Sequence, residues 1–168
     1  MSSDRNIVLT GFMGTGKTTV GHLVAARLKR EFIDTDAELV RRDGRAIPDI
    51  FAQDGEAAFR AMERRLCRFL AAHRGYVIAT GGGMLVDDGN RRVMLASGLV
   101  ICLNATPEAI EQRVGDTAGE RPLLRDDWQA LLATRQAAYA AILHQINTTS
   151  KTPEEVAEEV IALWQQSA

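Results

Sequence analysis

Short apolar runs alternate along this chain with segments in which apolar residues recur every three or four positions. The strongest runs cover residues 7–10, 76–80 and 99–103, and weaker ones cover 32–34 and 145–147. Runs of this length are typical of β-strands, whereas the three- and four-residue spacing is typical of helices. The spacing predicts helices over residues 17–30, 37–42, 48–53, 56–73, 90–96 and 127–143, with two more beginning near 107 and 153.

The alternation of strands with helices predicts a parallel sheet that is covered by helices on both faces. The 168 residues suit one domain, and no internal repeat, low-complexity tract or linker interrupts them. We therefore expect a single α/β domain over residues 1–168. The periodicity does not determine the order of the strands in the sheet.

Charge and composition argue against several classes of function. Twenty basic and 22 acidic residues give a net charge of -2, whereas binding to nucleic acid usually needs a large positive field. No apolar run is long enough to cross a membrane, and the first residues are too polar for a signal peptide, so we expect a cytoplasmic protein without membrane contact. Cys67 and Cys102 are too few for a disulfide framework or a zinc site, and we expect both to be buried.

A phosphate-binding motif follows the first predicted strand. Residues 11–18 read GFMGTGKT, which fits G-x-x-x-x-G-K-[ST] and opens a predicted helix, as the motif requires. Glycines let successive backbone N–H groups face an anion, while Lys17 can reach the outer phosphates and the Thr18 hydroxyl can bind Mg²⁺. The motif alone is compatible with an ATPase, a GTPase, a kinase or a switch. The predicted phosphate-binding residues are Gly14, Thr15, Gly16, Lys17, Thr18 and Thr19.

The residues that follow the other strands are candidates for binding the second substrate. Ligands of parallel sheets lie beyond the carboxyl ends of the strands, where this chain has Asp34 and Asp36 after one strand and glycines at 81–83 after the next. We expect Asp34 to support Mg²⁺ through water and Asp36 to accept a hydrogen bond from a substrate hydroxyl. The alternative for this pair is a structural role, with one aspartate as a helix cap and the other as a solvated charge. The triple glycine would allow close approach of backbone to a ligand.

Three arginines complete the candidate site. Arg60 precedes Glu63 by one helical turn, so that the carboxylate can orient the guanidinium. Arg121 lies in a glycine-containing loop over residues 115–126 and could swing onto the transferring phosphate, and Arg135 lies on the next helix. The planar fork of arginine suits carboxylates and phosphates. We expect the neighbouring arginines on the long helix to be solvated, namely Arg64, Arg65 and Arg68.

These motifs together resemble the shikimate kinase family over residues 6–163. The segments that carry the resemblance read GFMGTGKTTVG, FIDTD, IPDIFAQDGEAAFR, VIATGGG and RPLL, in the order of the family. The resemblance implies a P-loop NTPase-type three-layer α/β/α fold with a five-stranded parallel sheet in the order 2-3-1-4-5. It also implies a substrate-binding segment over about residues 35–62 and a lid over about 115–126.

The activity implied by the resemblance is the ATP-dependent phosphorylation of the 3-hydroxyl of shikimate, in aromatic amino-acid (chorismate) biosynthesis. It implies Mg²⁺ as cofactor, ATP as co-substrate and a monomer. The implied catalytic residues are Lys17, Asp36 and Arg121, with Thr18 and Asp34 at the metal. The implied substrate ligands are Asp36, Arg60, Gly82 and Arg135, and the implied adenine-binding residues are Arg113 and Pro153, with Arg121 also toward ATP.

One segment departs from the family pattern. After Arg135 the family usually shows a proline and then a leucine-tyrosine pair, whereas here the three residues 136–138 are Gln-Ala-Ala before Tyr139. The role of Arg135 therefore depends on where the fold places it.

Two other functions stay open at this point. Another P-loop kinase acting on a small hydroxy acid, such as a gluconate-type kinase, would keep the phosphate cradle and need different acceptor residues. A catalytically inactive module that binds shikimate or a nucleotide would not require all the proposed catalytic residues, which are intact in this chain: Lys17, Thr18, Asp34, Asp36 and Arg121.

Overall fold

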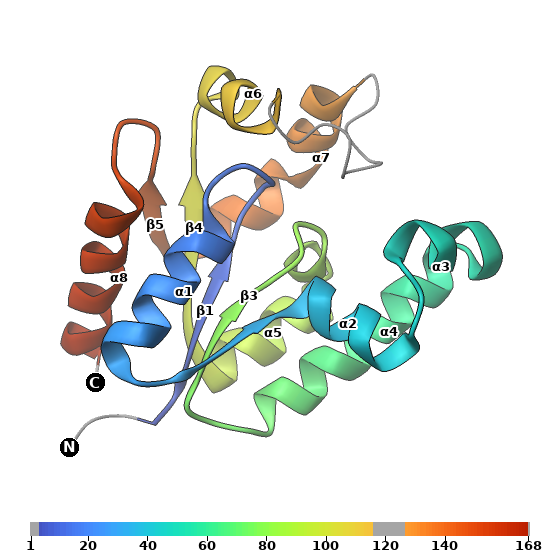
Figure 1. Cartoon of the computed structure of the whole chain (residues 1–168), viewed down its shortest axis with the longest axis horizontal. Coiled ribbons are helices and arrows are strands. Elements are labelled where there is room, and N and C mark those ends of the chain that lie inside the picture. The colour runs from blue at the N-terminus through green and yellow to red at the C-terminus, as the bar shows by residue number, and fades with distance from the viewer. Residues whose placement is uncertain (1–3, 116–126, 168) are drawn as a thin grey trace.

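One parallel sheet forms the centre of the computed structural model, which describes residues 4–115 and 127–167. Its strands run in the order β2-β3-β1-β4-β5, and all four pairings are parallel (Figure 1). The five-stranded sheet and its strand order are therefore confirmed. The strands are β1 (Asn6–Thr10), β2 (Glu31–Asp34), β3 (Tyr76–Ala79), β4 (Gly98–Asn104) and β5 (His144–Asn147).

Helices occupy most of the connections between the strands, close to where the sequence predicts them. They are α1 (Lys17–Leu28), α2 (Thr35–Asp43), α3 (Ile47–Asp54), α4 (Glu56–Ala71), α5 (Asp88–Ser97), α6 (Pro107–Gly115), α7 (Trp128–Ala140) and α8 (Pro153–Ser167). The helix expected over residues 37–42 begins earlier because Asp34 caps it. The helix expected over 127–143 ends at Ala140, and Leu143 beyond it is 84% exposed. A short 3₁₀ helix, η1 (Met84–Val86), is not predicted by the pattern.

Alternating residues of the central strand β1 pack against helices on opposite faces of the sheet. Ile7 and Leu9 belong to a cluster with apolar residues of α1 and α8, and these two helices lie side by side (Figure 1). Val8 belongs to a second cluster with residues of α4, α5 and α7. Both faces of β1 are buried as in other parallel sheets. The expected three-layer α/β/α arrangement is confirmed.

The strand register brings three functional segments to one edge of the sheet. Strand β3 lies between β1 and β2, with Ala79 opposite Leu9 on one side and Asp34 on the other. The phosphate-binding motif after β1, the aspartates after β2 and the glycines after β3 therefore emerge side by side. This edge lies at the carboxyl ends of the strands, where parallel sheets place their ligands.

The two cysteines are buried, as expected. Cys67 is a buried residue of α4, and Cys102 is a buried residue of β4. Burial raises the pKa of the Cys67 thiol to about 12 and that of Cys102 to about 11, so that both stay protonated at neutral pH. In the part of the chain that the structure describes, every helix is too short or too polar to span a membrane.

Candidate active site

A cavity of about 1100 Å³ opens at the carboxyl edge of the sheet. Every predicted site residue within the described ranges lines this cavity, from the loop after β1 to the start of α8. Arg121 and the rest of the segment 116–126 in the predicted lid lie outside the described residues. The predicted residues that line the cavity are Gly14, Thr15, Gly16, Lys17, Thr18, Thr19, Asp34, Asp36, Arg60, Gly82, Arg113, Arg135 and Pro153.

The phosphate-binding loop leads directly into the first turn of α1, which begins at Lys17. Gly14 and Gly16 have φ values of +76° and +97°, which residues with a side chain rarely adopt. Lys17 Nζ reaches back across the loop and donates to the carbonyl oxygens of Gly11, at 2.6 Å, and Phe12, at 2.9 Å. The lysine charge and the partial positive charge of the helix N-terminus therefore lie at one place. Such a combination favours binding of a polyphosphate.

Asp34 joins the loop to the start of α2. Its Oδ1 accepts from the Ala37 backbone N–H at 3.0 Å, which caps the helix, and its Oδ2 accepts from the Thr18 hydroxyl at 3.1 Å. The Asp34 carboxylate therefore both caps α2 and lies beside Thr18. Capping fixes the orientation of the side chain. A hydroxyl and a carboxylate are oxygen ligands of the kind that Mg²⁺ prefers, so the two residues fit the expected metal.

No larger metal cluster is available within residues 4–115 and 127–167. The structure shows no group of three or more His, Cys, Asp or Glu side chains there that could hold an ion. A divalent cation near Thr18 would therefore need further oxygen ligands from a bound phosphate or from water, as is usual for Mg²⁺.

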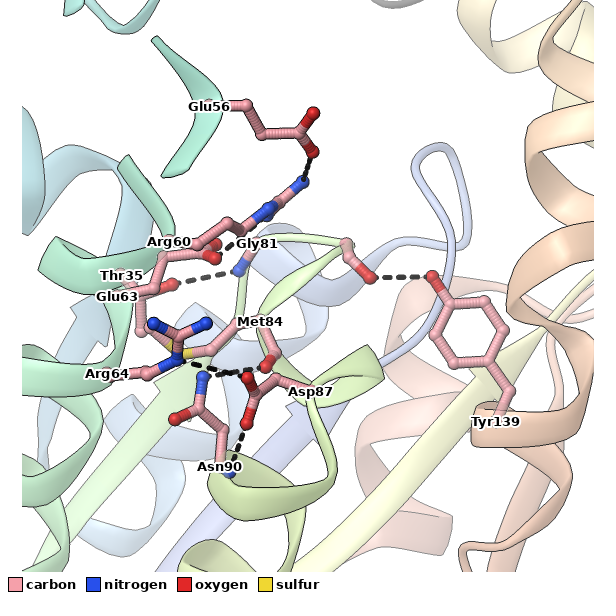
Figure 2. A network of polar contacts seen from close by, with 11 residues as sticks. Thr35, Glu56, Arg60, Glu63, Arg64, Gly81, Met84, Asp87, Asn90 and Tyr139 are labelled. Carbon is pink, nitrogen blue, oxygen red and sulfur yellow. Dashed lines mark hydrogen bonds and ion pairs between the residues drawn. The ribbon is translucent and has the colours of Figure 1, made fainter. Parts of the chain in front are cut away.

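Arg60 is held by two acidic side chains of α4. Its Nη1 donates to Glu63 Oε2 at 2.8 Å and its Nη2 donates to Glu56 Oε1 at 3.3 Å (Figure 2). The Glu63 side chain is only 2% exposed, whereas that of Arg60 is 24% exposed toward the cavity. Burial raises the pKa of Glu63 above its usual value, although the hydrogen bond from Arg60 acts in the opposite direction. The expected orienting role of Glu63 is supported by this geometry.

Each glycine of the triple-glycine loop, residues 81–83, lies against one charged side chain of the cavity. A Cβ at Gly81 would clash with the Asp36 carboxylate. A Cβ at Gly82 would lie 2.8 Å from Arg135 Nη1, and one at Gly83 would lie 2.5 Å from Arg60 Nη1. None of the three has a left-handed φ, so a side chain at these positions would act by displacing the neighbouring charged group and not by straining the backbone.

Arg135 lies in the cavity despite the unusual residues that follow it. It is 6% exposed, and its guanidinium carbon lies 5.7 Å from the centre of the Phe12 ring, within the range of a cation–π contact. Tyr139, one turn further along α7, donates from its hydroxyl to the Gly82 carbonyl oxygen at 2.8 Å. The substitutions at residues 136–138 therefore leave the arginine in the predicted place.

Arg113 connects three segments at the other end of the cavity. Its Nη1 donates to the Gly14 carbonyl oxygen at 3.1 Å and to the Thr148 hydroxyl at 3.0 Å, while its Nη2 donates to the Thr148 carbonyl oxygen at 2.8 Å. Thr148 in turn donates to the Thr15 carbonyl oxygen at 3.1 Å. Pro153, at the start of α8, lines the same cavity. The structure therefore brings Arg113 and Pro153 together beside the phosphate-binding loop.

An apolar wall of the cavity is not predicted by the sequence. Phe51 of α3 and Phe59 of α4 have ring centres 4.8 Å apart and line the cavity with Ile47 and Pro48. Helical spacing marks such positions as apolar but cannot distinguish a pocket wall from a core. Lys151, which is paired with Glu159 at 2.6 Å, also lines the cavity without a prior signal. The arginines expected to be solvated, Arg64, Arg65 and Arg68, are exposed.

The arrangement has the chemistry to hold two anions. One end offers a helix N-terminus, Lys17 and oxygen ligands beside them, which suits a nucleoside triphosphate with Mg²⁺. The other end offers the guanidinium groups of Arg60 and Arg135 with the Asp36 carboxylate and an apolar wall, which suits a small ring that carries a carboxylate and hydroxyls.

Comparison with known proteins gives a consistent result over almost the whole chain. The shikimate kinase family model matches residues 13–165. A shikimate kinase of Pelotomaculum thermopropionicum is 45% identical over 162 residues, which cover 94% of both chains. The structure of an Acinetobacter baumannii shikimate kinase in complex with shikimate superposes with a TM-score of 0.91 at 34% identity, covering 99% of this chain and 96% of that one.

A gluconokinase is a much more distant neighbour. The enzyme of Sinorhizobium meliloti has a TM-score of 0.62 and is 18% identical, over 98% of this chain and 94% of its own. At this identity the likeness concerns the fold alone.

The raised pKa of Glu63 predicts a particular pH dependence of folding. The folded protein keeps the Glu63 proton at pH values where the unfolded chain, with a pKa of about 4.3, has already lost it. The unfolding free energy contributed by this group therefore falls as the pH rises from about 4.3 through the raised pKa. In Glu63→Gln this contribution is absent, so the unfolding free energy of the variant relative to the wild type should increase over that window.

Urea unfolding at a series of pH values from about 4 to 7 measures this difference. Glu158, whose side chain is 71% exposed, provides the matched control Glu158→Gln, for which we expect no such trend. A constant difference between Glu63→Gln and the wild type would contradict the assignment.

Proposed function

The chain belongs to the shikimate kinase family, and we propose that it transfers the γ-phosphoryl group of ATP to the 3-hydroxyl of shikimate. The products are shikimate 3-phosphate and ADP, in the biosynthesis of aromatic amino acids through chorismate. The observation that carries the proposal is that one cavity joins a phosphate-binding loop to two arginines and an aspartate around a triple glycine. Family membership supports this chemistry over nearly the full length of the chain.

The triphosphate of ATP would be bound by the loop at the start of α1, residues 14–19. Lys17 would exchange its carbonyl partners for the outer phosphates and neutralise the charge that develops during transfer. Thr18 would bind Mg²⁺ directly and Asp34 would hold it through water, since both side chains supply oxygen. When bound, Mg²⁺ supplies positive charge beside the phosphate oxygens.

The adenine ring would lie between Arg113 and Pro153. Arg113 has its guanidinium fixed by Gly14 and Thr148, and a fixed planar guanidinium is a good surface for stacking. Pro153 begins α8 next to Thr148 and Lys151 in the same wall of the cavity. The nucleotide would therefore span the cavity from α8 to the phosphate-binding loop.

Shikimate would occupy the other end, within reach of the substrate-binding segment, about residues 35–62. Arg60 and Arg135 would hold its carboxylate in their planar forks, with the Gly82 backbone beside them. The apolar edge of its ring would rest on the wall that contains Phe51 and Phe59. The expected lid residue Arg121 would complete the site by contacting the phosphoryl group in transfer.

Asp36 would act on the attacking hydroxyl. We place it at the 3-hydroxyl of shikimate, where its carboxylate accepts the proton as the oxygen forms its bond to the γ-phosphorus. The bond from that phosphorus to the leaving ADP oxygen breaks at the same time, so that phosphorus keeps the same number of oxygen neighbours. Because phosphoryl transfer depends mainly on positioning and charge, the orientation of this carboxylate matters as much as its basicity. Its close contact with Gly81 supports a fixed orientation.

Two competing functions are weaker on specific grounds. A gluconate-type kinase shares the fold with this chain at 18% identity, far below the identity of the shikimate kinases. A module without catalysis would not need Lys17, Thr18, Asp34 and Asp36 arranged along one cavity. We propose further that the enzyme is a cytoplasmic monomer.

A panel of acceptors tests the proposed function. The protein is incubated with Mg²⁺ and ATP together with shikimate, quinate, gluconate or no acceptor, and the release of ADP is followed. We expect shikimate to accelerate ADP release at least ~100-fold over the reaction without acceptor, since typical enzymes turn over once to a thousand times per second. Equal rates with and without shikimate would contradict the proposal, and preference for gluconate would favour the alternative kinase.

The variant Asp36→Asn tests the role of the aspartate. We expect the turnover number to fall by ~100- to 10,000-fold, the range typical of loss of a general base, because the amide accepts no proton. The affinity for ATP should change less than about threefold, since Asp36 lies at the acceptor end of the cavity. Steady-state kinetics with equilibrium binding of ATP give both values. Near-normal turnover in Asp36→Asn would rule out the assigned role.

A further inference from the structure

Two buried hydroxyl groups hold the triple-glycine loop from opposite sides. The Thr35 hydroxyl, on α2, accepts from the Gly81 backbone N–H at 2.8 Å. The Tyr139 hydroxyl, on α7, donates to the Gly82 carbonyl oxygen at 2.8 Å. Figure 2 shows Thr35 and Tyr139 approaching the loop from its two sides. Thr35 is fully buried and Tyr139 is 3% exposed, so both hydroxyl groups are held within the protein interior.

The loop needs such contacts because it cannot position itself. The last backbone hydrogen bond between β3 and β1 before the loop runs from the Thr80 N–H to the Leu9 carbonyl oxygen, at 3.0 Å. Three successive glycines then follow, which have no side chains to pack and the largest conformational freedom of any residue. The carbonyl oxygens of Gly81 and Gly83 accept from Met84 and Val86 within η1, whereas that of Gly82 accepts from a helix far along the chain.

The hydrogen bond from Tyr139 connects the Gly82 backbone to the helix that carries Arg135, and we place both groups at the carboxylate of the acceptor. Arg135 and Tyr139 are one turn apart on α7, and Gly82 lies against both: a Cβ there would be 2.8 Å from Arg135 Nη1 and 3.7 Å from Tyr139 Oη. The bond therefore fixes the distance between the Gly82 backbone and the Arg135 guanidinium. If it were absent, the loop and the helix could move relative to each other.

Tyr139 itself does not line the cavity that holds the candidate site. It lines a separate, smaller cavity of about 370 Å³ behind the phosphate-binding loop, with Phe12 and Thr15. Burial raises the pKa of Tyr139 to about 12, against a lowering effect of Arg135, so that its hydroxyl remains a donor throughout the neutral range. Tyr139 therefore does not line the cavity in which we place the substrates, and it acts on the acceptor through the groups that it holds.

We propose that Tyr139 is a positioning residue for the acceptor: its hydroxyl holds the Gly82 backbone and the Arg135 guanidinium in the relative arrangement that binds the shikimate carboxylate. Thr35 has the corresponding place at Gly81, next to Asp36. The assignment rests on the proposed function for the identity of the acceptor. It predicts an effect on the acceptor that does not extend to ATP, because the nucleotide end of the cavity is formed by other segments.

The variant Tyr139→Phe removes the hydroxyl and keeps the ring. We expect the KM for shikimate to rise ~5- to 30-fold, as loss of one buried hydrogen bond implies, with a smaller change in kcat, since Gly82 and Arg135 contact the acceptor before and during transfer alike. The KM for ATP should stay within about twofold of the wild-type value. Tyr76, the other tyrosine of the chain, is at the start of β3 at the opposite edge of the sheet, and Tyr76→Phe is the matched control with wild-type values for both substrates.

A second pair of variants tests the same arrangement without touching α7. Thr35→Val removes the hydroxyl that accepts from Gly81 and should raise the KM for shikimate. Thr35→Ser retains a hydroxyl and should show the wild-type KM for shikimate. Equilibrium binding of shikimate without ATP, together with urea unfolding, is measured for all four variants. A merely structural role would lower stability and affect both substrates equally.

The outcomes separate this proposal from the proposed function. A wild-type KM for shikimate in Tyr139→Phe, or an equal rise in the KM values for shikimate and ATP, would overturn the positioning role while leaving the kinase activity intact. Shikimate-dependent ADP release by the wild-type protein is measured first. Its absence would overturn the proposed function instead. A rise confined to shikimate in Tyr139→Phe and Thr35→Val supports the positioning role.

Discussion

The candidate site depends on the close approach of a backbone loop without side chains to three charged groups. Residues 81–83 contact Asp36 from α2, Arg60 from α4 and Arg135 from α7. Side chains at these positions would occupy the space of the charged groups. The loop therefore allows groups from three separate helices to converge at the carboxyl edge of the sheet, and the parallel strands β1, β2 and β3 determine where that edge lies.

Convergence of charge has an energetic cost that the surrounding residues reduce. Moving charges away from water is unfavourable unless they are paired and hydrogen-bonded. Arg60 is paired with Glu63, and Arg135 lies over the Phe12 ring while Tyr139 packs beside it. A protein with a net charge of only -2 can therefore concentrate positive charge in one cavity. Lys17, Arg60, Arg113 and Arg135 all line this cavity, which places their charge where small anionic substrates bind.

Much of this arrangement could be predicted from the sequence, because some motifs carry their own physical context. The phosphate-binding motif lies between a strand and a helix, and the order of strands came from the family resemblance and not from periodicity. The motif predicts Asp34 at the metal through water, and the structure places its carboxylate beside Thr18, where it also caps α2 and begins that helix at Thr35. Thr35, Tyr139 and Phe51 could not be assigned, since a buried hydroxyl or ring acquires its role only from partners distant in the chain.

The most direct test of this account is to add one methyl group to the loop. In Gly83→Ala the new Cβ would lie 2.5 Å from Arg60 Nη1, so the guanidinium must move while the backbone, at φ -91°, accepts alanine. Calorimetric titration with shikimate should give at least ~10-fold weaker binding, with an unfolding free energy within ~1 kcal/mol of the wild type. Gly89→Ala, outside the cavity on α5, is the control. Unchanged shikimate affinity in Gly83→Ala would contradict the claim that the site depends on the close approach of this loop to Arg60.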